Sequence, residues 1–435
     1  MSPPTVGLVT LGVLFVFIFF GLPIGFAMGL IGFAGLVYLM GFNPALSVIG
    51  LMPFSTSASY VMSILPLFTI MGFWASYAGL TKGAYNAGHK LLGNLPGGLA
   101  MSNVVGCAIF SAVSGSSLAC SSAMGSVCMP EMRRYKYDPA LATGSIAAGA
   151  VLDIMIPPST AMVIYALITE SSIGRLLIAG ILPGIMLALL FMITIYIMVK
   201  HNPSLAPPSP PASLREKLAA FKDVWGITLL FVLAIGGIYA GIFTPTEGAA
   251  VGAFCAFLFM VFNKQLDRKR LADSVLQTVQ LTGMIFTIVI GAMIFNSFLA
   301  VSRLPQMLAD WVGGLPLPPY GILGIILLTY IPLGMVMDTL AMVLLTVPIY
   351  FPLVQVLGFD PIWFGVLIIV MMEQAMLTPP VGVVVFVLSG VVPEVPMYTI
   401  FRGVLPFLIA IFVGLLLIMV FPQIVLFLPN LMIGK

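Results

Sequence analysis

Hydroxyl groups, one carboxyl group and glycine gather at two short tips inside otherwise apolar sequence, and these residues could bind ions. The first tip is Ser114, Gly115, Ser116 and Ser117. The second tip is Met337, Asp338 and Thr339. Hydroxyl, carboxylate and carbonyl oxygens are the ligands that sodium takes in membrane transporters. The two tips therefore predict two related cation sites.

Each tip stands between two short apolar arms. Around the first tip the arms are residues 99–113 and 118–130, each at most fifteen residues long. A helix of that length reaches about 22 Å, which is less than the roughly 30 Å of a bilayer core. We therefore expect two re-entrant hairpins, 99–130 and 321–352. Irregular backbone is not tolerated against lipid, so the tips should lie in a polar cavity.

Two further apolar segments, 139–170 and 361–392, are each interrupted by a proline pair. Proline removes an amide hydrogen and clashes with the preceding turn, which frees backbone carbonyls at the break. We expect the first tip to share a cation with Ile156 and Pro157, and the second with Thr378 and Pro379. A proline pair can also be only a kink, and Asp338 can be neutral and satisfied by the backbone.

An anionic substrate should lie between the two tips, because the N-terminus of each half-helix carries a partial positive charge that attracts an anion. The candidate hydrogen-bonding residues are Ser116, Ser117, Ser159 and Thr160. Asp153 and Glu373 stand just before the two breaks, and for them a structural role and a direct ion role both remain open. The cysteines lie inside apolar segments without metal-ligand spacing, so we expect small buried hydrophobic residues at Cys107, Cys120, Cys128 and Cys255.

The composition excludes an ordinary soluble protein. Of the 435 residues, 61% are hydrophobic and only 7% are charged, whereas soluble domains carry about 25% charged residues. The sequence predicts an all-α polytopic membrane protein. No basic region precedes the first apolar run, so a cleaved signal peptide is not expected.

The chain carries an internal repeat with a shift of 222 residues. The shift relates Pro23 to Pro245 and Pro96 to Pro318, and it relates the proline pair at 157–158 to the pair at 379–380. We expect two halves, 1–205 and 223–435, joined by a Pro-rich linker at 206–222. Five spans and one hairpin per half make an odd number of crossings, so the second half should be inverted relative to the first.

Basic residues alternate between the halves as inversion requires. Loop 131–138 holds three basic residues, and its repeat mate at 353–359 holds none. Since cytoplasmic loops collect Lys and Arg, the linker should be cytoplasmic and both termini periplasmic. Basic residues also lie in a predicted loop at 82–90. The polar segment 264–282 predicts an interfacial helix on the cytoplasmic face, with a simple loop as the alternative.

A few charged residues near the predicted periplasmic ends are candidates for docking an external partner. They are Glu247, Arg303, Glu170 and Arg175. Ordinary interfacial charges are the alternative explanation.

At these motifs the sequence resembles the large membrane subunit of the tripartite ATP-independent periplasmic (TRAP) transporters. The matching stretches are 114–117, 156–159, Asp338, Asp360-Pro361 and 378–382. The resemblance implies an elevator-type secondary transporter of the bacterial inner membrane that imports organic anions with sodium. It also implies two separate partners, a small four-helix membrane subunit and a periplasmic substrate-binding protein.

Family substrates include C4-dicarboxylates and acidic sugars such as sialic acid. None of the four midplane motifs contains Arg or Lys, which favours a monocarboxylate such as sialic acid. The alternative is that bound sodium and helix dipoles pair with a second carboxylate. The alternatives are a stand-alone sodium–carboxylate symporter and a passive channel. An intramembrane enzyme is disfavoured, because no His or Cys pair, Ser-Lys pair or paired aspartates stand at helical spacing.

Overall fold

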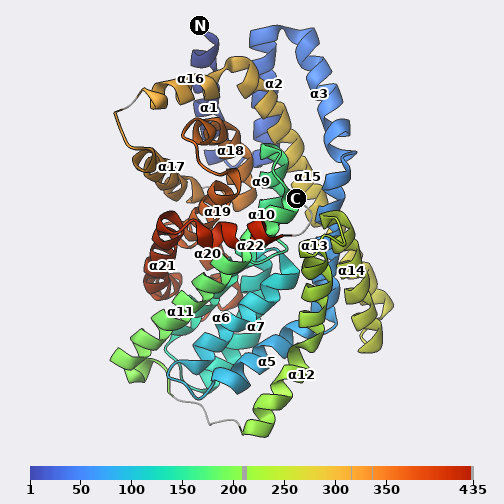
Figure 1. Cartoon of the computed structure of the whole chain (residues 1–435), viewed down its shortest axis with the longest axis vertical. Coiled ribbons are helices and arrows are strands. Elements are labelled where there is room, and N and C mark those ends of the chain that lie inside the picture. Colours follow the sequence, from blue (N-terminus) through green and yellow to red (C-terminus); the bar gives the residue numbers. More distant parts are fainter. Residues whose placement is uncertain (208–212, 315, 336, 433–435) are drawn as a thin grey trace.

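The structure is a computed structural model, and it describes residues 1–207, 213–314, 316–335 and 337–432. These residues form helices and connecting turns, with no strand among them (Figure 1). The first elements are α1 (Pro3–Phe19), α2 (Ile24–Met40), α3 (Phe42–Ser57), η1 (Tyr60–Ser63), α4 (Ile64–Tyr77), α5 (Leu80–Leu92), α6 (Gly98–Ser114), α7 (Ser117–Arg134), α8 (Pro139–Met155), α9 (Thr160–Thr169), α10 (Ile173–Ala179), α11 (Ile181–His201) and η2 (Pro203–Leu205).

The later elements follow the same order of long helices, hairpin arms and broken helix. They are α12 (Leu214–Phe231), η3 (Val232–Gly236), α13 (Gly237–Tyr239), α14 (Pro245–Phe262), α15 (Arg268–Ser302), α16 (Leu304–Gly313), α17 (Pro319–Gly334), α18 (Thr339–Val356), α19 (Pro361–Leu377), α20 (Val383–Val391), α21 (Met397–Val420) and α22 (Gln423–Leu431). Helix α6 begins at 98 and α17 at 319, which is 221 residues later, and α8 begins at 139 and α19 at 361, which is 222 later. The inversion of the two halves stays a prediction.

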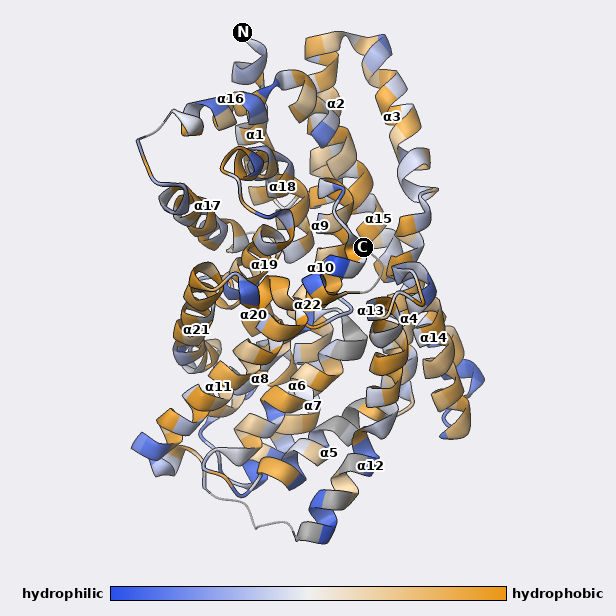
Figure 2. Ribbon diagram, viewed as in Figure 1, coloured by the Kyte–Doolittle hydropathy of each residue, from blue (hydrophilic) through white to orange (hydrophobic). Residues whose placement is uncertain are grey.

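Many of these helices are apolar along their whole length. Among the described residues, eight helical stretches are long and apolar enough to cross a membrane. They are Tyr60–Tyr77, Pro139–Thr169, Ile173–His201, Arg215–Tyr239, Pro245–Phe262, Arg268–Ser302, Thr339–Val356 and Met397–Val420. Figure 2 shows hydrophobic residues along the helices and hydrophilic residues at the ends of helices such as α11, α12 and α14. The predicted all-helical membrane fold is confirmed.

Helices α8 and α19 form the buried centre of the molecule. Residues 141–155 of α8 and 362–377 of α19 are all buried, and the two helices contact each other. Close helix packing depends on glycine here, because a Cβ on Gly144 of α8 would lie 2.3 Å from the carbonyl oxygen of Gly403 in α21. The helices that end at the two breaks are therefore held tightly by their neighbours.

A second set of contacts joins α2, α4, α14 and α15. Helix α2 runs along α15, where a Cβ on Gly291 would lie 1.9 Å from the carbonyl oxygen of Gly25. Such close backbone approach is the usual use of small residues in membrane helix pairs. Helix α4 contacts both α14 and α15. We refer to α2, α4, α14 and α15 as the outer helices.

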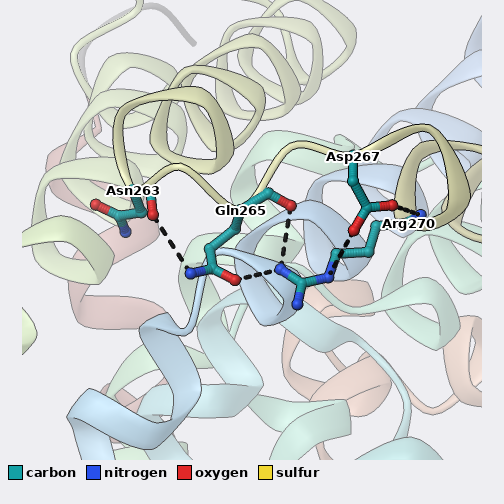
Figure 3. A network of polar contacts seen from close by, with 4 residues as sticks. All are labelled: Asn263, Gln265, Asp267 and Arg270. Carbon is teal, nitrogen blue, oxygen red and sulfur yellow. Dashed lines mark hydrogen bonds and ion pairs between the residues drawn. The ribbon is translucent and has the colours of Figure 1, made fainter.

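The segment 264–282 is helical from Arg268, as one of the two alternatives predicted, but the helix does not end at 282. Its position at the membrane interface stays a prediction. The segment runs without a break into α15, which has 35 residues and continues to Ser302. No proline interrupts residues 268–302, so nothing removes a backbone hydrogen bond within the helix. At its start Asp267 accepts a hydrogen bond from the backbone N–H of Arg270 (2.8 Å), and Figure 3 shows Gln265 and Asn263 extending this polar network.

The predicted loop at 82–90 is also wrong, because these residues lie in α5. Tyr85 and Ala87 are buried, and α5 packs on α6, so one face of the helix has an apolar partner. Lys90 makes an ion pair of 2.7 Å with Asp223 of α12. Helix α12 itself begins inside the predicted linker, where Ser213 and Glu216 form a capping box.

The hairpin arms are longer than the sequence indicated. Helices α6, α7, α17 and α18 have 17, 18, 16 and 18 residues, so the longest reach about 27 Å. Helix α7 continues through the charged residues Glu131 and Arg133, and α18 continues through two prolines, Pro348 and Pro352. Arm length alone is therefore a weak argument for re-entry, which stays a prediction.

Candidate functional site

The first tip lies against the break between α8 and α9. Gly115 has φ +67°, and a Cβ there would lie 3.0 Å from the carbonyl oxygen of Pro158. Only glycine combines this left-handed backbone with so close an approach at little cost. The hydroxyl of Thr160 donates a hydrogen bond to the carbonyl of Gly115 (3.3 Å). The structure thus brings the predicted tip and the first proline break together.

Serine side chains cap the two helices that begin at this junction. Ser116 caps α7 by accepting a hydrogen bond from the N–H of Ala119 (3.4 Å), and Ser159 caps α9 by accepting one from Met162 (3.3 Å). The hydroxyl of Ser117 is buried and has no hydrogen-bond partner in the described structure. The side chain of Ser114 lies outside the described residues. Two helix N-termini therefore meet at one point, next to an unsatisfied hydroxyl.

The second tip lies against the end of α19. Asp338 caps α18 by accepting a hydrogen bond from the N–H of Ala341 (3.2 Å). Thr339 donates to the sulfur of Met376 in α19 (2.8 Å), while Thr378 donates back to the carbonyl of Gln374 (2.8 Å). Met337 is buried, and because a methionine side chain has no oxygen, only its backbone carbonyl can be an oxygen ligand.

One cavity of about 280 Å³ joins the two tips. Its tip residues are Gly115, Ser116, Ser117, Asp338 and Thr339, and Thr160 lines it from α9. The outer helices supply one wall with Thr69 of α4 and Leu281, Met284 and Ile285 of α15, and α8, α9 and α19 add Ile154, Ala161 and Met376. Segments more than 220 residues apart in the chain thus line one space.

Not every predicted site residue lines this cavity. Ile156, Pro157, Ser159, Thr378 and Pro379 are absent from its lining. Ser159 is only 1% exposed and its oxygen is used in the cap of α9, so its predicted contact with substrate is not available in this structure. Pro379, in contrast, is exposed.

A second cavity of about 400 Å³ continues from the first. The two share Thr69, Ser116, Ala119 and Leu281. From the first tip the second cavity follows α7 past Ser122 and Ser126 toward the end of α7 that carries Arg133 and Arg134. Its opposite wall includes Tyr77 of α4 and Gln277 of α15. The sequence offers no signal for this wall, because its residues lie about 200 positions apart.

Two carboxyl groups are buried beside the tips. Asp153 and Glu373 are fully buried, and neither has a hydrogen-bond partner of normal geometry among the described residues. Asp153 lies near the hydroxyl of Ser111 and the amides of Gly115 and Ser116. Glu373 is close enough to Asp153 for their charges to interact. The sequence marked both residues but did not indicate that Asp153 lies under the first tip.

The predicted docking residues lie at helix ends. The carboxylate of Glu247 accepts hydrogen bonds from the N–H (2.8 Å) and hydroxyl (2.9 Å) of Thr244 and so caps α14. Arg175 donates to Asn430 of α22 (3.1 Å). Glu170 and Arg303 are exposed residues with positive φ that end α9 and α15. These contacts give Glu247 and Arg175 structural roles, and partner docking stays untested.

The cysteines largely follow their prediction. Cys107, Cys120 and Cys128 are buried free thiols. Cys255 is only partly buried, which corrects the expectation for that residue. It lies on α14, whose outer face is exposed to the surroundings of the protein.

The sequence matches the family described as the tripartite ATP-independent periplasmic transporter, DctM component, over residues 11–424. The chain belongs to this family. It is 37% identical over 403 residues to the C4-dicarboxylate TRAP transporter large permease protein DctM of Pseudomonas aeruginosa, covering 92% of this chain and 93% of the relative. It is 34% identical over 421 residues to the sialic acid TRAP transporter large permease protein SiaM of Vibrio cholerae, covering 96% and 97%.

A solved structure has a similar fold. The YdaH transporter of Alcanivorax borkumensis, whose crystal structure is described as revealing an unusual topology, matches with a TM-score of 0.67 over 88% of this chain and 89% of that one. The identity is 13%, so this likeness concerns the fold alone. The chain is a large TRAP permease subunit and a multi-pass protein of the inner membrane, as its sequence predicted.

Proposed function

We propose that this TRAP permease imports an organic anion across the inner membrane with sodium, by an elevator movement. The observation that carries the proposal is the cavity where the two tips meet. It contains Asp338 and several hydroxyl groups, and the N-termini of α7 and α18 begin at its edge. Oxygen ligands suit sodium, and helix N-termini suit an anion.

The two proposed cation sites follow the two tip contacts. The first would use oxygens of Gly115 and Ser117 with backbone carbonyls at Ile156 and Pro157, because the tip lies directly on that break. Asp153, near the amides of this tip, would add negative charge behind it. A cation bound here would also satisfy the unpartnered hydroxyl of Ser117.

The second cation site would use Asp338, Thr339 and the backbone of Met337. Thr378 and Pro379 would complete it from the end of α19. Asp338 supports the assignment because acidic groups at membrane depth are costly and usually functional. The cap to Ala341 uses one carboxylate oxygen, which leaves the other for a cation.

The proposed elevator movement is inferred from the helices that line the two cavities. Their walls come from two groups of helices, with α4 and α15 on one side and the hairpin α6–α7 on the other. Toward the second cavity α7 and its cap present small residues, Ser116, Ala119, Ser122, Ala123 and Ser126, which suits sliding. By the positive-inside rule the basic end of α7 is cytoplasmic, so this state would be open to the cytoplasm.

We further propose two protein partners, a small four-helix membrane subunit and a periplasmic binding protein. The relatives named above are large permease proteins of TRAP transporters, which supports this assembly. The substrate class includes C4-dicarboxylates and sialic acid, the substrates in the relatives' names.

Transport in liposomes tests the proposal. The permease with its small subunit would be reconstituted, and uptake of radiolabelled succinate and sialic acid measured with a cognate binding protein outside. We expect uptake of one anion only when both a sodium gradient and the binding protein are present. Uptake without the binding protein would favour a stand-alone symporter, and flux unaffected by the sodium gradient would indicate a channel.

A further inference from the structure

The second cavity carries a wall of hydrogen-bonding groups that the transport proposal does not use. Helix α7 contributes Ser122 and Ser126, and the outer helices contribute Ser76, Tyr77 and Gln277. Ser122, Ser126 and Ser76 are hydroxyl groups on short side chains, which leave the space between the walls open. Neutral donors and acceptors therefore line the path from the tips.

The same cavities hold no basic side chain among their described lining residues, and Asp338 is the one charged side chain in either lining. An anion with two carboxylates would bring a second negative charge next to these groups without a cation to pair with it. Removing that charge from water without a partner is costly. Neutral hydroxyl groups on a substrate carry no charge that must be removed from water, and Ser122, Tyr77 and Gln277 offer them hydrogen-bonding groups.

Gln277 is the best-placed group on this wall. Its side-chain amide donates a hydrogen bond to the hydroxyl of Tyr77 across the gap between α15 and α4 (3.3 Å). One turn away, Trp74 donates to the hydroxyl of Ser274 (3.0 Å) and joins the same two helices. The Gln277 side chain is thus held in position, while its carbonyl oxygen has no other hydrogen bond in the described structure.

We propose that this wall selects organic anions with one carboxylate and several neutral hydroxyl groups, and that Gln277 is a specificity-determining residue. The proposal rests on the transport function above and narrows its substrate class. The carboxylate would lie at the tips, where helix N-termini and sodium are available. The hydroxyl groups would extend along α7 toward Gln277 and Tyr77.

Ligand binding to the purified permease with its small subunit tests this inference, because it avoids the selectivity of the binding protein. Binding of gluconate, hexanoate and succinate would be measured by calorimetry with and without sodium. Gluconate and hexanoate have equal carbon chains and differ in their hydroxyl groups. We expect gluconate to bind at least about tenfold more tightly than either of the others, and only with sodium.

The variant Gln277→Leu removes the hydrogen-bonding group at nearly constant volume. One lost hydrogen bond is worth about a tenfold change in affinity, so the preference for gluconate should fall about tenfold while hexanoate binding stays unchanged. Gln355→Leu, at an exposed position on α18 outside both cavities, is the matched control. Tyr77→Phe should give a smaller loss, because Gln277 remains.

The outcomes separate this inference from the transport proposal. Sodium-dependent binding with equal affinity for gluconate and hexanoate, tighter binding of succinate, or an unchanged preference in Gln277→Leu would overturn the selectivity alone. Anion binding that ignores sodium would instead contradict the transport proposal. The unfolding temperature of each variant shows whether it folds. If Gln277→Leu does not fold, Tyr77→Phe and the wild-type preference for gluconate test the selectivity instead.

Discussion

The variant Asp338→Asn separates the charge of the second tip from its structural role. Asp338 caps α18 through one oxygen, which accepts from the N–H of Ala341. Asparagine is as good an N-cap as aspartate, so α18 should begin at the same residue. The variant therefore removes the negative charge and one cation ligand, and it keeps the tip.

The expected effect on sodium binding can be worked out from the position of the carboxylate. Two unit charges about 4 Å apart attract by about 4 kcal/mol at an effective dielectric constant of about 20. Asp338 is half-buried, so we take about half of this, about 2 kcal/mol. Since each 1.4 kcal/mol is about tenfold in affinity, the sodium concentration for half-maximal uptake should rise about 30-fold.

The assay is anion uptake into liposomes at increasing external sodium, with the unfolding temperature measured in parallel. Asp310→Asn, at an exposed position on α16, is the matched control and should leave both quantities unchanged. A sodium requirement within about twofold of the wild type in Asp338→Asn would refute the role of this carboxylate. Loss of the folded protein would show instead that asparagine does not replace the cap.

The packing around the site gives three further predictions. Gly115→Ala should lower uptake and the unfolding temperature, because alanine at φ +67° is strained and crowded. The control is Gly358→Ala, which has φ +77° but open space around it. Equal losses of uptake in both variants would contradict the contact between the first tip and the break. Gly291→Leu should force α2 away from α15 and lower the free energy of unfolding by about 3 kcal/mol or more. The control Gly283→Leu lies on the same helix, meets open space and should cost little. Similar melting curves for the two variants would be inconsistent with close packing of α2 on α15. Glu247→Gln should leave uptake driven by the binding protein unchanged, because the wild-type carboxylate is engaged in capping α14. A selective loss of that uptake in a variant that still folds would restore the docking role of Glu247.

The helix starts around the site were predictable because their signals are local. Ser116, Ser159 and Asp338 each cap the helix that follows, and such caps are recognisable from residue type and position. The proline pairs likewise mark breaks that the structure has at 156–159 and 378–382. Membership of the TRAP family follows from the same motifs.

The outer wall of the cavity was not predictable from the sequence. Tyr77 and Gln277 meet only because α4 packs on α15, and nothing in either local sequence specifies that pairing. The sequence also treated Ser116 and Ser159 alike, although only Ser116 lines the cavity. Their difference depends on which side of a helix end faces the second tip, which is decided by tertiary packing.

The central claim is that the two tips reach one cavity from opposite sides of the membrane. Sided labelling tests it most directly, with single cysteines introduced as Arg134→Cys and Val356→Cys in a chain whose four native cysteines are replaced. Both positions are exposed, at the C-terminal ends of α7 and α18. A membrane-impermeant thiol reagent applied from the periplasm should modify the cysteine at 356 and should reach the one at 134 only after permeabilisation. Labelling of both positions from the same side would contradict the inverted arrangement.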